Sequence, residues 1–137
     1  MSARKSIIFI VNPISGTHGK EDMPKLIEEH LDTSVFRHEV VFTEYAGHAA
    51  ELARHYANEG ADVVVAVGGD GTVNEVARSL VHTQTALGII PCGSGNGLAR
   101  HLCLPLDPVR AIKMINCCQI EEFDYGVINE AKIGRAG

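Results

Sequence analysis

DVVVAVGGDGT, residues 62–72, contains the strongest strand signal in the chain. Consecutive β-branched and small apolar residues over 62–67 predict a strand that is buried on both faces. The glycines that follow predict a tight turn. Apolar residues then recur at the spacing of an amphipathic helix: Val73, Val76, Ala77, Leu80 and Val81. A buried strand that turns through glycines into a helix is typical of the βα unit of a parallel sheet.

The same alternation of strand and helix extends on both sides of this stretch. Further strands are predicted over residues 6–12, 35–42, 86–90 and 120–127, and helices over 23–31, 49–56, 98–101 and 108–117. The segment 35–42 is the most polar of the long strands, which favours a place near the sheet edge. Gly60 is expected to end the helix predicted over residues 49–56. The predicted fold class is α/β, a three-layer α/β/α domain with a mostly parallel sheet.

The length and composition indicate one globular domain. The chain has 137 residues, of which 45% are hydrophobic, too many for a disordered chain. No apolar run approaches the ~20 residues that span a bilayer, and no signal-peptide cleavage site follows the short apolar run at 7–11. The sequence therefore predicts no transmembrane segment and a cytoplasmic location.

Charge and residue types argue against two classes of binding protein. The formal net charge is −5 and tryptophan is absent, so the basic surface and stacking groups of a nucleic-acid binder are missing. The four cysteines and seven histidines lack the spacing of a zinc site. We therefore expect no nucleic-acid partner and assign no metal ligand from these residues.

Three predicted strands end in loops that could hold an anion, at residues 12–16, 68–72 and 93–97. The carboxyl ends of parallel strands meet at one edge of a sheet, where ligands bind. Glycine lets the backbone approach an anion closely, and the next helix start supplies free N–H groups. Three such loops favour a polyphosphate ligand over plain turns. Neither the Walker spacing nor GxGxxG is present.

Asp70 is the informative residue of these loops, because a carboxylate between two glycines at a helix start would repel phosphate. Two chemical roles fit it: holding a Mg²⁺ ion that bridges the phosphates, or taking a proton from an attacking hydroxyl. A structural alternative is that Asp70 caps a helix that begins near Thr72. The residues alone leave these three interpretations open.

Three segments resemble the signatures of the diacylglycerol kinase catalytic-domain family: NPISG at 12–16, GGDGTVNEV at 68–76 and IPCGSGNGLAR at 90–100. TEYAGHAAELA at 43–53 resembles the family's intervening segment, whereas NAD kinases and 6-phosphofructokinases share only GGDGT. The resemblance implies a phosphofructokinase/NAD-kinase-like nucleotide-binding domain. It also implies ATP and Mg²⁺ as cofactors, and a diacylglycerol-like or sphingoid lipid at a membrane surface as the phosphate acceptor.

The resemblance also implies site residues by their motif positions. The implied ATP-binding positions are Asn12, Pro13, Ile14, Ser15, Gly16, Thr43, Gly68, Gly69, Asp70, Gly71, Thr72, Val73, Asn74, Glu75, Gly93, Ser94 and Asn96. The implied catalytic residues are Asp70, Arg100 and Asp124. Gly97 stands where bacterial relatives often carry Asp, so any role of that carboxylate is lost or moved here.

Members of the family carry a second, β-rich domain, which the resemblance places outside residues 1–137. Residues 1–137 are thus expected to form the ATP-binding domain of a lipid kinase, inactive alone and prone to self-association through exposed apolar surface. The closing AKIGRAG, 131–137, is unlike the family. Two alternatives are a nucleotide-binding module without turnover and an NAD-kinase-like phosphotransferase.

Overall fold

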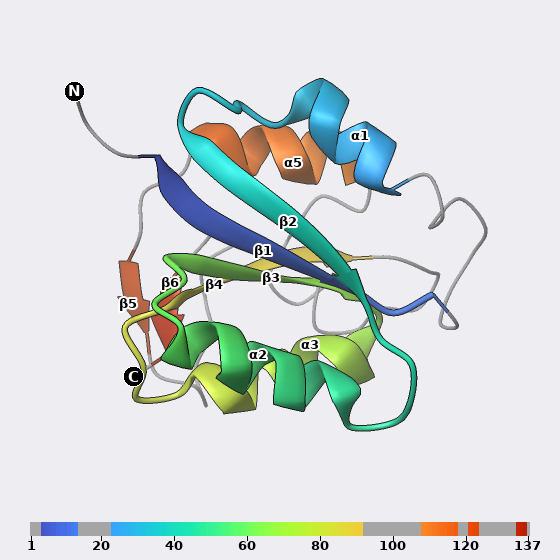
Figure 1. Cartoon of the computed structure of the whole chain (residues 1–137), viewed down its shortest axis with the longest axis vertical. Helices are drawn as coiled ribbons and strands as arrows, with labels where there is room; N and C mark the ends of the chain where they lie inside the picture. Colours follow the sequence, from blue (N-terminus) through green and yellow to red (C-terminus); the bar gives the residue numbers. More distant parts are fainter. Residues whose placement is uncertain (1–3, 14–22, 92–107, 118–120, 124–133, 137) are drawn as a thin grey trace.

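A computed structural model of the chain describes residues 4–13, 23–91, 108–117, 121–123 and 134–136 (Figure 1). Strands and helices alternate along these residues in the following order: β1 (Lys5–Val11), α1 (Met23–His30), β2 (Phe36–Phe42), α2 (His48–Asn58), β3 (Val63–Gly68), α3 (Asp70–Leu80), β4 (Ala86–Pro91), α5 (Pro108–Cys117), β5 (Glu121–Phe123) and β6 (Gly134–Ala136). The predicted elements are confirmed within a few residues. The helix predicted over 98–101 lies outside the described residues, and only 121–123 of the strand predicted over 120–127 is described.

The strands form one sheet in the order β2-β1-β3-β4-β6-β5. The four long strands, β1 to β4, are parallel to one another, and β2 lies at the edge, as its polar sequence predicts. Strand β6 runs antiparallel to β4 and pairs in parallel with β5. The mostly parallel sheet is confirmed, and part of the closing segment 131–137 belongs to it.

Side chains along each buried strand point alternately to the two faces of the sheet, so the interior is divided into two cores. On β3, Val63, Val65 and Val67 face the core that α1 and α5 cover. Val64 and Ala66 face the opposite core, under α2 and α3. Because successive strand residues point to opposite faces, a strand that is apolar throughout needs a helical layer on each side. Figure 1 shows these three layers, which confirm the predicted α/β/α architecture.

Gly60 ends α2 as the sequence predicts. Its φ of 89° is left-handed, a conformation that favours glycine. The Gly60 N–H donates to the Ala57 carbonyl at 3.1 Å, and the Ala61 N–H donates to the Tyr56 carbonyl at 3.0 Å. These two bonds satisfy the last carbonyls of the helix and direct the chain into β3.

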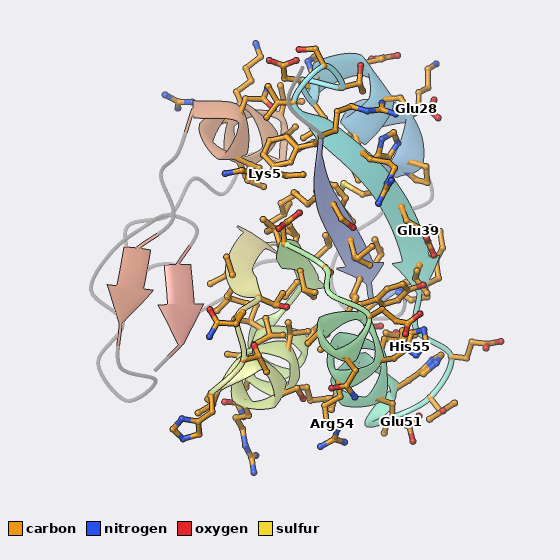
Figure 2. All side chains as sticks on the ribbon, turned by 60° about the vertical axis from the view of Figure 1, so that its left-hand side comes forward. Lys5, Glu28, Glu39, Glu51, Arg54 and His55 are labelled. Carbon is orange, nitrogen blue, oxygen red and sulfur yellow. The ribbon has the colours of Figure 1, made fainter. Side chains whose placement is uncertain are left out.

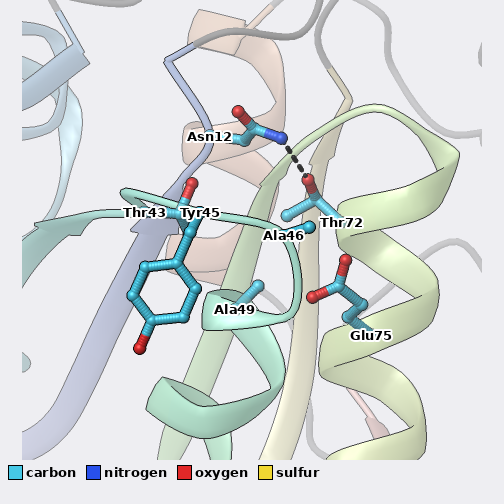
Figure 3. Close-up of a pocket in the computed structure, with 7 residues that line it drawn as sticks. All are labelled: Asn12, Thr43, Tyr45, Ala46, Ala49, Thr72 and Glu75. Carbon is cyan, nitrogen blue, oxygen red and sulfur yellow. Dashed lines mark hydrogen bonds between the residues drawn. The ribbon is translucent and has the colours of Figure 1, made fainter.

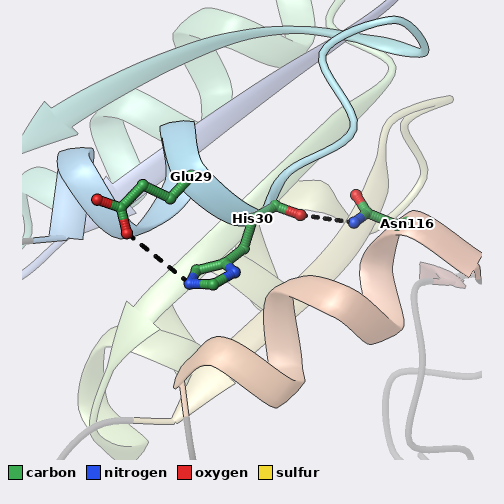
Figure 4. Close-up of polar contacts among 3 residues, drawn as sticks. All are labelled: Glu29, His30 and Asn116. Carbon is green, nitrogen blue, oxygen red and sulfur yellow. Dashed lines mark hydrogen bonds and ion pairs between the residues drawn. The ribbon is translucent and has the colours of Figure 1, made fainter.

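Asn116 of α5 joins the two helices on the first face of the sheet (Figure 4). Its side-chain Nδ2 donates to the His30 carbonyl at the end of α1, at 2.7 Å. Its Oδ1 accepts a hydrogen bond from the Asp32 N–H at 2.8 Å. One amide thus satisfies two backbone groups where α1 gives way to the turn before β2.

Replacing Asn116 by alanine should therefore lower the free energy of unfolding by about 1–3 kcal/mol, because two hydrogen bonds are lost and backbone groups are left unpaired. Chemical denaturation monitored by circular dichroism measures this. The matched control is Asn58→Ala at the exposed end of α2, which should change stability by no more than about 0.5 kcal/mol. Equal losses for the two variants would contradict the bridging role.

Candidate functional site

The loops after three parallel strands meet at the carboxyl edge of the sheet. In register, Val11 lies opposite Phe42 on one side and Val67 on the other, so β1, β2 and β3 end level with one another. A pocket of about 230 Å³ opens at this edge (Figure 3). The residues that line it come from the ends of these strands and from α2 and α3: Asn12, Thr43, Tyr45, Ala46, Ala49, Thr72 and Glu75.

A side-chain hydrogen bond connects two of the predicted site segments. Asn12 Nδ2, after β1, donates to Thr72 Oγ1, in the first turn of α3, at 3.1 Å across 60 residues of sequence. Backbone bonds position the neighbouring groups: the Thr43 N–H donates to the Val11 carbonyl, and the Asn12 N–H to the Val67 carbonyl. The pocket floor is therefore built by the sheet itself, with little freedom for its side chains to move apart.

Helix α3 begins at Asp70, and its N-cap is Gly69, whose φ of −88° and ψ of −169° are extended. The interpretation of Asp70 as the cap of a helix beginning near Thr72 is wrong. The helix starts two residues earlier, at Asp70. The first turn of α3 leaves N–H groups without intrahelical partners, as every helix start does, and such groups suit an anion.

The glycines of this turn serve two different purposes. A Cβ on Gly68 would meet Thr72 Oγ1 at 3.0 Å and Thr72 Cβ at 3.1 Å, so strand and helix approach closely here and any larger residue would have to displace the Thr72 side chain. A Cβ on Gly69 or Gly71 would meet no described atom within 4 Å. Because a glycine inside a helix costs about 1 kcal/mol relative to alanine, Gly71 is unfavourable for the chain alone. The space above Gly71, which no described residue occupies, suits the close approach of a ligand.

The loop after β2 forms the facing wall and is held by its own contacts. Gly47 has a left-handed φ of 87° at the start of α2. The Glu44 N–H donates to His48 Nδ1 at 2.9 Å, and the Tyr45 ring stacks on the His48 ring at 4.3 Å between centroids. The Tyr45 hydroxyl donates to Glu51, and this hydrogen bond raises the pKa of Tyr45.

Glu75 has a carboxylate oxygen that no other described residue satisfies. Its Oε1 is buried and has no hydrogen-bond partner among the described residues. Figure 3 shows the carboxylate projecting from α3 toward Ala46 and Ala49, into the pocket. A buried acceptor without a donor is costly in the free chain. The site therefore contains an acceptor in a position to receive a ligand's N–H or O–H group.

The structure brings together four of the residues predicted for the site, Asn12, Thr43, Thr72 and Glu75. Gly68, Gly69 and Gly71 form the adjoining strand-to-helix turn, whereas Pro13 and Asn74 are exposed and do not line the pocket. Val73 does not line the pocket either: its side chain is in the core, and its N–H donates to the Gly69 carbonyl.

The remaining predicted site residues lie outside the described part of the chain: Ile14, Ser15, Gly16, Gly93, Ser94, Asn96, Arg100 and Asp124. For Asp70, only the backbone is described. Three pocket residues were missed by sequence reasoning: Tyr45, Ala46 and Ala49. The sequence could have indicated them, because they follow the carboxyl end of a predicted parallel strand.

Two further findings concern metals and membranes. Among the residues that the structure describes, no group of three or more His, Cys, Asp or Glu side chains could hold a metal ion. Within the same ranges, no helix has both the length and the apolar character needed to cross a bilayer.

The architecture defines the class: a three-layer α/β domain of the phosphofructokinase/NAD-kinase-like fold, with its pocket at the carboxyl edge of the parallel sheet. Within that class, the chain belongs to the diacylglycerol kinase catalytic domain family, which matches residues 6–128. The match ends before the closing segment 131–137 that contains β6.

Relatives in sequence and in structure agree with this assignment. A diacylglycerol kinase of Staphylococcus saprophyticus is 35% identical over 129 residues, covering 92% of this chain and 42% of the relative. One from Staphylococcus aureus is 34% identical over 133 residues, covering 92% and 41%. The crystal structure of a diacylglycerol kinase from Bacillus anthracis has a TM-score of 0.72 and 27% identity, covering 85% and 41%. The chain thus spans about two fifths of the length of these proteins.

The two kinds of glycine should respond oppositely to alanine. Gly68→Ala should lower the free energy of unfolding by about 1–3 kcal/mol, because the new methyl group displaces Thr72. Gly71→Ala should raise it by about 0.5–1 kcal/mol, because a helical position gains alanine without a clash. Urea denaturation of both variants measures the difference. A destabilising Gly71→Ala would show that this glycine is required by the fold.

Proposed function

We propose that the chain is the ATP-binding part of a lipid kinase that transfers the γ-phosphoryl group of ATP to a lipid hydroxyl. The observation that carries the proposal is the pocket joined to an open, glycine-lined helix start in a member of this family. Both features lie at the carboxyl edge of a parallel sheet, where α/β proteins bind their ligands.

The residues present fit a nucleotide. The open positions at Gly69 and Gly71 leave room for phosphate oxygens close to the backbone N–H groups of the first turn of α3. Thr43 contributes a hydroxyl group to the pocket, and Glu75 Oε1, which has no hydrogen-bond partner among the described residues, offers an acceptor. ATP, when bound, supplies the phosphoryl group that is transferred. The chain's own residues orient it and offset its negative charge.

Asp70 is proposed as the group that holds Mg²⁺ against the phosphates or accepts the proton of the attacking hydroxyl. Its position as the first residue of α3, one residue after the N-cap Gly69, supports a role beside the phosphates. Arg100 and Asp124 stay proposed catalytic residues by their motif positions. Positioning and charge neutralisation are the main requirements of phosphoryl transfer, and these residue types provide both.

A diacylglycerol-like or sphingoid lipid is proposed as the phosphate acceptor. The protein is proposed to be cytoplasmic and to bind this lipid at a membrane surface. The relatives support a lipid because they are named diacylglycerol kinases. They are also more than twice as long as the part that this chain matches. We therefore propose that the 137-residue chain alone binds nucleotide without phosphorylating lipid, and that it self-associates.

ATP binding is expected to depend on open space at the helix start. Gly69→Val should abolish it, because the side chain enters the space proposed for phosphate, while the extended φ at this position accepts valine. Isothermal titration calorimetry of the 137-residue chain measures binding, and a thermal melt confirms folding. Unchanged ATP affinity in the folded variant would contradict the phosphate site.

Lipid phosphorylation is the test of the acceptor and of Asp70. In a protein that carries this chain at the relatives' full length, radiolabelled ATP should label diacylglycerol or sphingosine in mixed micelles and leave NAD⁺ unlabelled. Asp70→Asn should reduce labelling at least about a hundredfold with little change in stability, since a proton acceptor or metal ligand is lost. Labelling of NAD⁺ in place of lipid would favour the NAD-kinase-like alternative, and full labelling by Asp70→Asn would remove Asp70 from the chemistry.

A further inference from the structure

Strand β2 has an edge that no described strand pairs with. It stands at one end of the sheet, and its described partner is β1 alone. The Val35 carbonyl and the Thr43 N–H both bond to β1, so the odd-numbered residues between them direct their backbone groups to β1. The even-numbered residues His38 and Val40 therefore direct their N–H and carbonyl groups outward. Such an edge is a template for pairing with another chain.

Two opposite charges lie on this edge strand, two residues apart. Arg37 and Glu39 are both exposed, and they share one face of the sheet because alternate strand residues do. It is the face that α2 covers, since the Tyr56 hydroxyl of α2 donates to Glu39 Oε2 at 2.6 Å. Figure 2 shows Glu39 beside β2 at the outer margin of the sheet. Across the described residues, neither Arg37 nor Glu39 takes part in an ion pair.

Apolar side chains are exposed at both ends of the same strand. Val35, just before β2, is 40% exposed, and Phe42, its last residue, is 36% exposed. In the described part of the chain, the other large apolar side chain that is exposed is Tyr45, which lines the pocket. Covering the apolar groups of Val35 and Phe42 with a partner would remove them from water, which is favourable.

Few registers allow two copies of β2 to pair edge to edge. In an antiparallel pair about a two-fold axis, residues that direct their backbone outward must lie opposite one another, which puts the axis at a residue. An axis at Glu39 or at Arg37 would place that charge opposite itself, which is unfavourable. An axis at Val40 leaves both charges opposite uncharged residues. An axis at His38 places Arg37 of each copy opposite the partner's Glu39.

From these observations, we propose that two copies of this chain pair antiparallel through β2, with the two-fold axis at His38, and join their sheets into one. Arg37 of each copy forms an ion pair with the partner's Glu39, and Val35 lies beside the partner's Val41. Charges on an edge strand ordinarily prevent pairing, whereas these two select one partner in one register. The inference rests on the self-association proposed above, to which it gives a surface.

Charge reversal tests this register, because one reversal breaks the pairing and a second restores it. Arg37→Glu places carboxylates opposite each other in a pair of identical copies, and Glu39→Arg places guanidinium groups opposite each other. Mixing the two variants makes both cross-strand pairs complementary again. The matched controls are Arg54→Glu on α2 and Glu28→Arg on α1, which change the net charge equally at exposed positions (Figure 2).

Sedimentation equilibrium of the 137-residue chain measures the association, and circular dichroism melts establish that each variant is folded. The unmodified chain should form a dimer. Each reversal alone should weaken the dimer at least about tenfold, since two attractive pairs become two repulsive ones. The equimolar mixture should recover it, and both controls should dimerise as the unmodified chain does. Glu39→Gln, which keeps an acceptor for Tyr56, should weaken the dimer less than Glu39→Arg.

Each contrary result has a separate meaning. A chain that stays monomeric at millimolar concentration would contradict both the dimer and the proposed self-association. Association that is unchanged in Arg37→Glu and Glu39→Arg would place the contact on another surface and contradict this inference alone. A mixture that does not recover the dimer would contradict the register. The ATP affinity of each variant, measured alongside, tests the proposed kinase function independently.

Discussion

The close approach of strand β3 to the first turn of helix α3 is the constraint on which the site depends. Gly68 lies so near Thr72 that a methyl group would meet the Thr72 hydroxyl at 3.0 Å. Glycine at this position leaves the space that the Thr72 side chain occupies, and Thr72 Oγ1 accepts a hydrogen bond from Asn12, after the neighbouring strand. The same helix carries Glu75, whose side chain lines the pocket.

The parallel sheet gives these contacts their rigidity. Its central strands are buried on both faces, and their ends are level, so the loops that follow them have one common edge to occupy. The segments after β1 and β2 contribute side chains to the pocket, and each is anchored by a backbone hydrogen bond to a strand end, Asn12 to Val67 and Thr43 to Val11. A site assembled in this way needs no long loop of its own.

The pocket has two ends of different chemical character. Beside one end lies the glycine turn before α3, where positions that no described residue occupies adjoin the helix N–H groups, which suits negative charge. The other end contains the Glu75 carboxylate oxygen, which has no hydrogen-bond partner among the described residues and suits a neutral donor. Membership of the diacylglycerol kinase catalytic domain family gives this arrangement its proposed use in a lipid kinase.

The sequence by itself determined the fold class, the elements and the motif residues, because hydrophobic periodicity and glycine turns are local patterns that can be recognised without knowing the tertiary packing. It placed Asn12, Thr43, Thr72 and Glu75 in the site through their motifs. Only the tertiary structure decided that Val73 belongs to the core, that Gly69 is the N-cap of α3, and that residues of the loop after β2 form the facing wall. These depend on helix rotation and strand register, which are set by packing between segments far apart in the sequence.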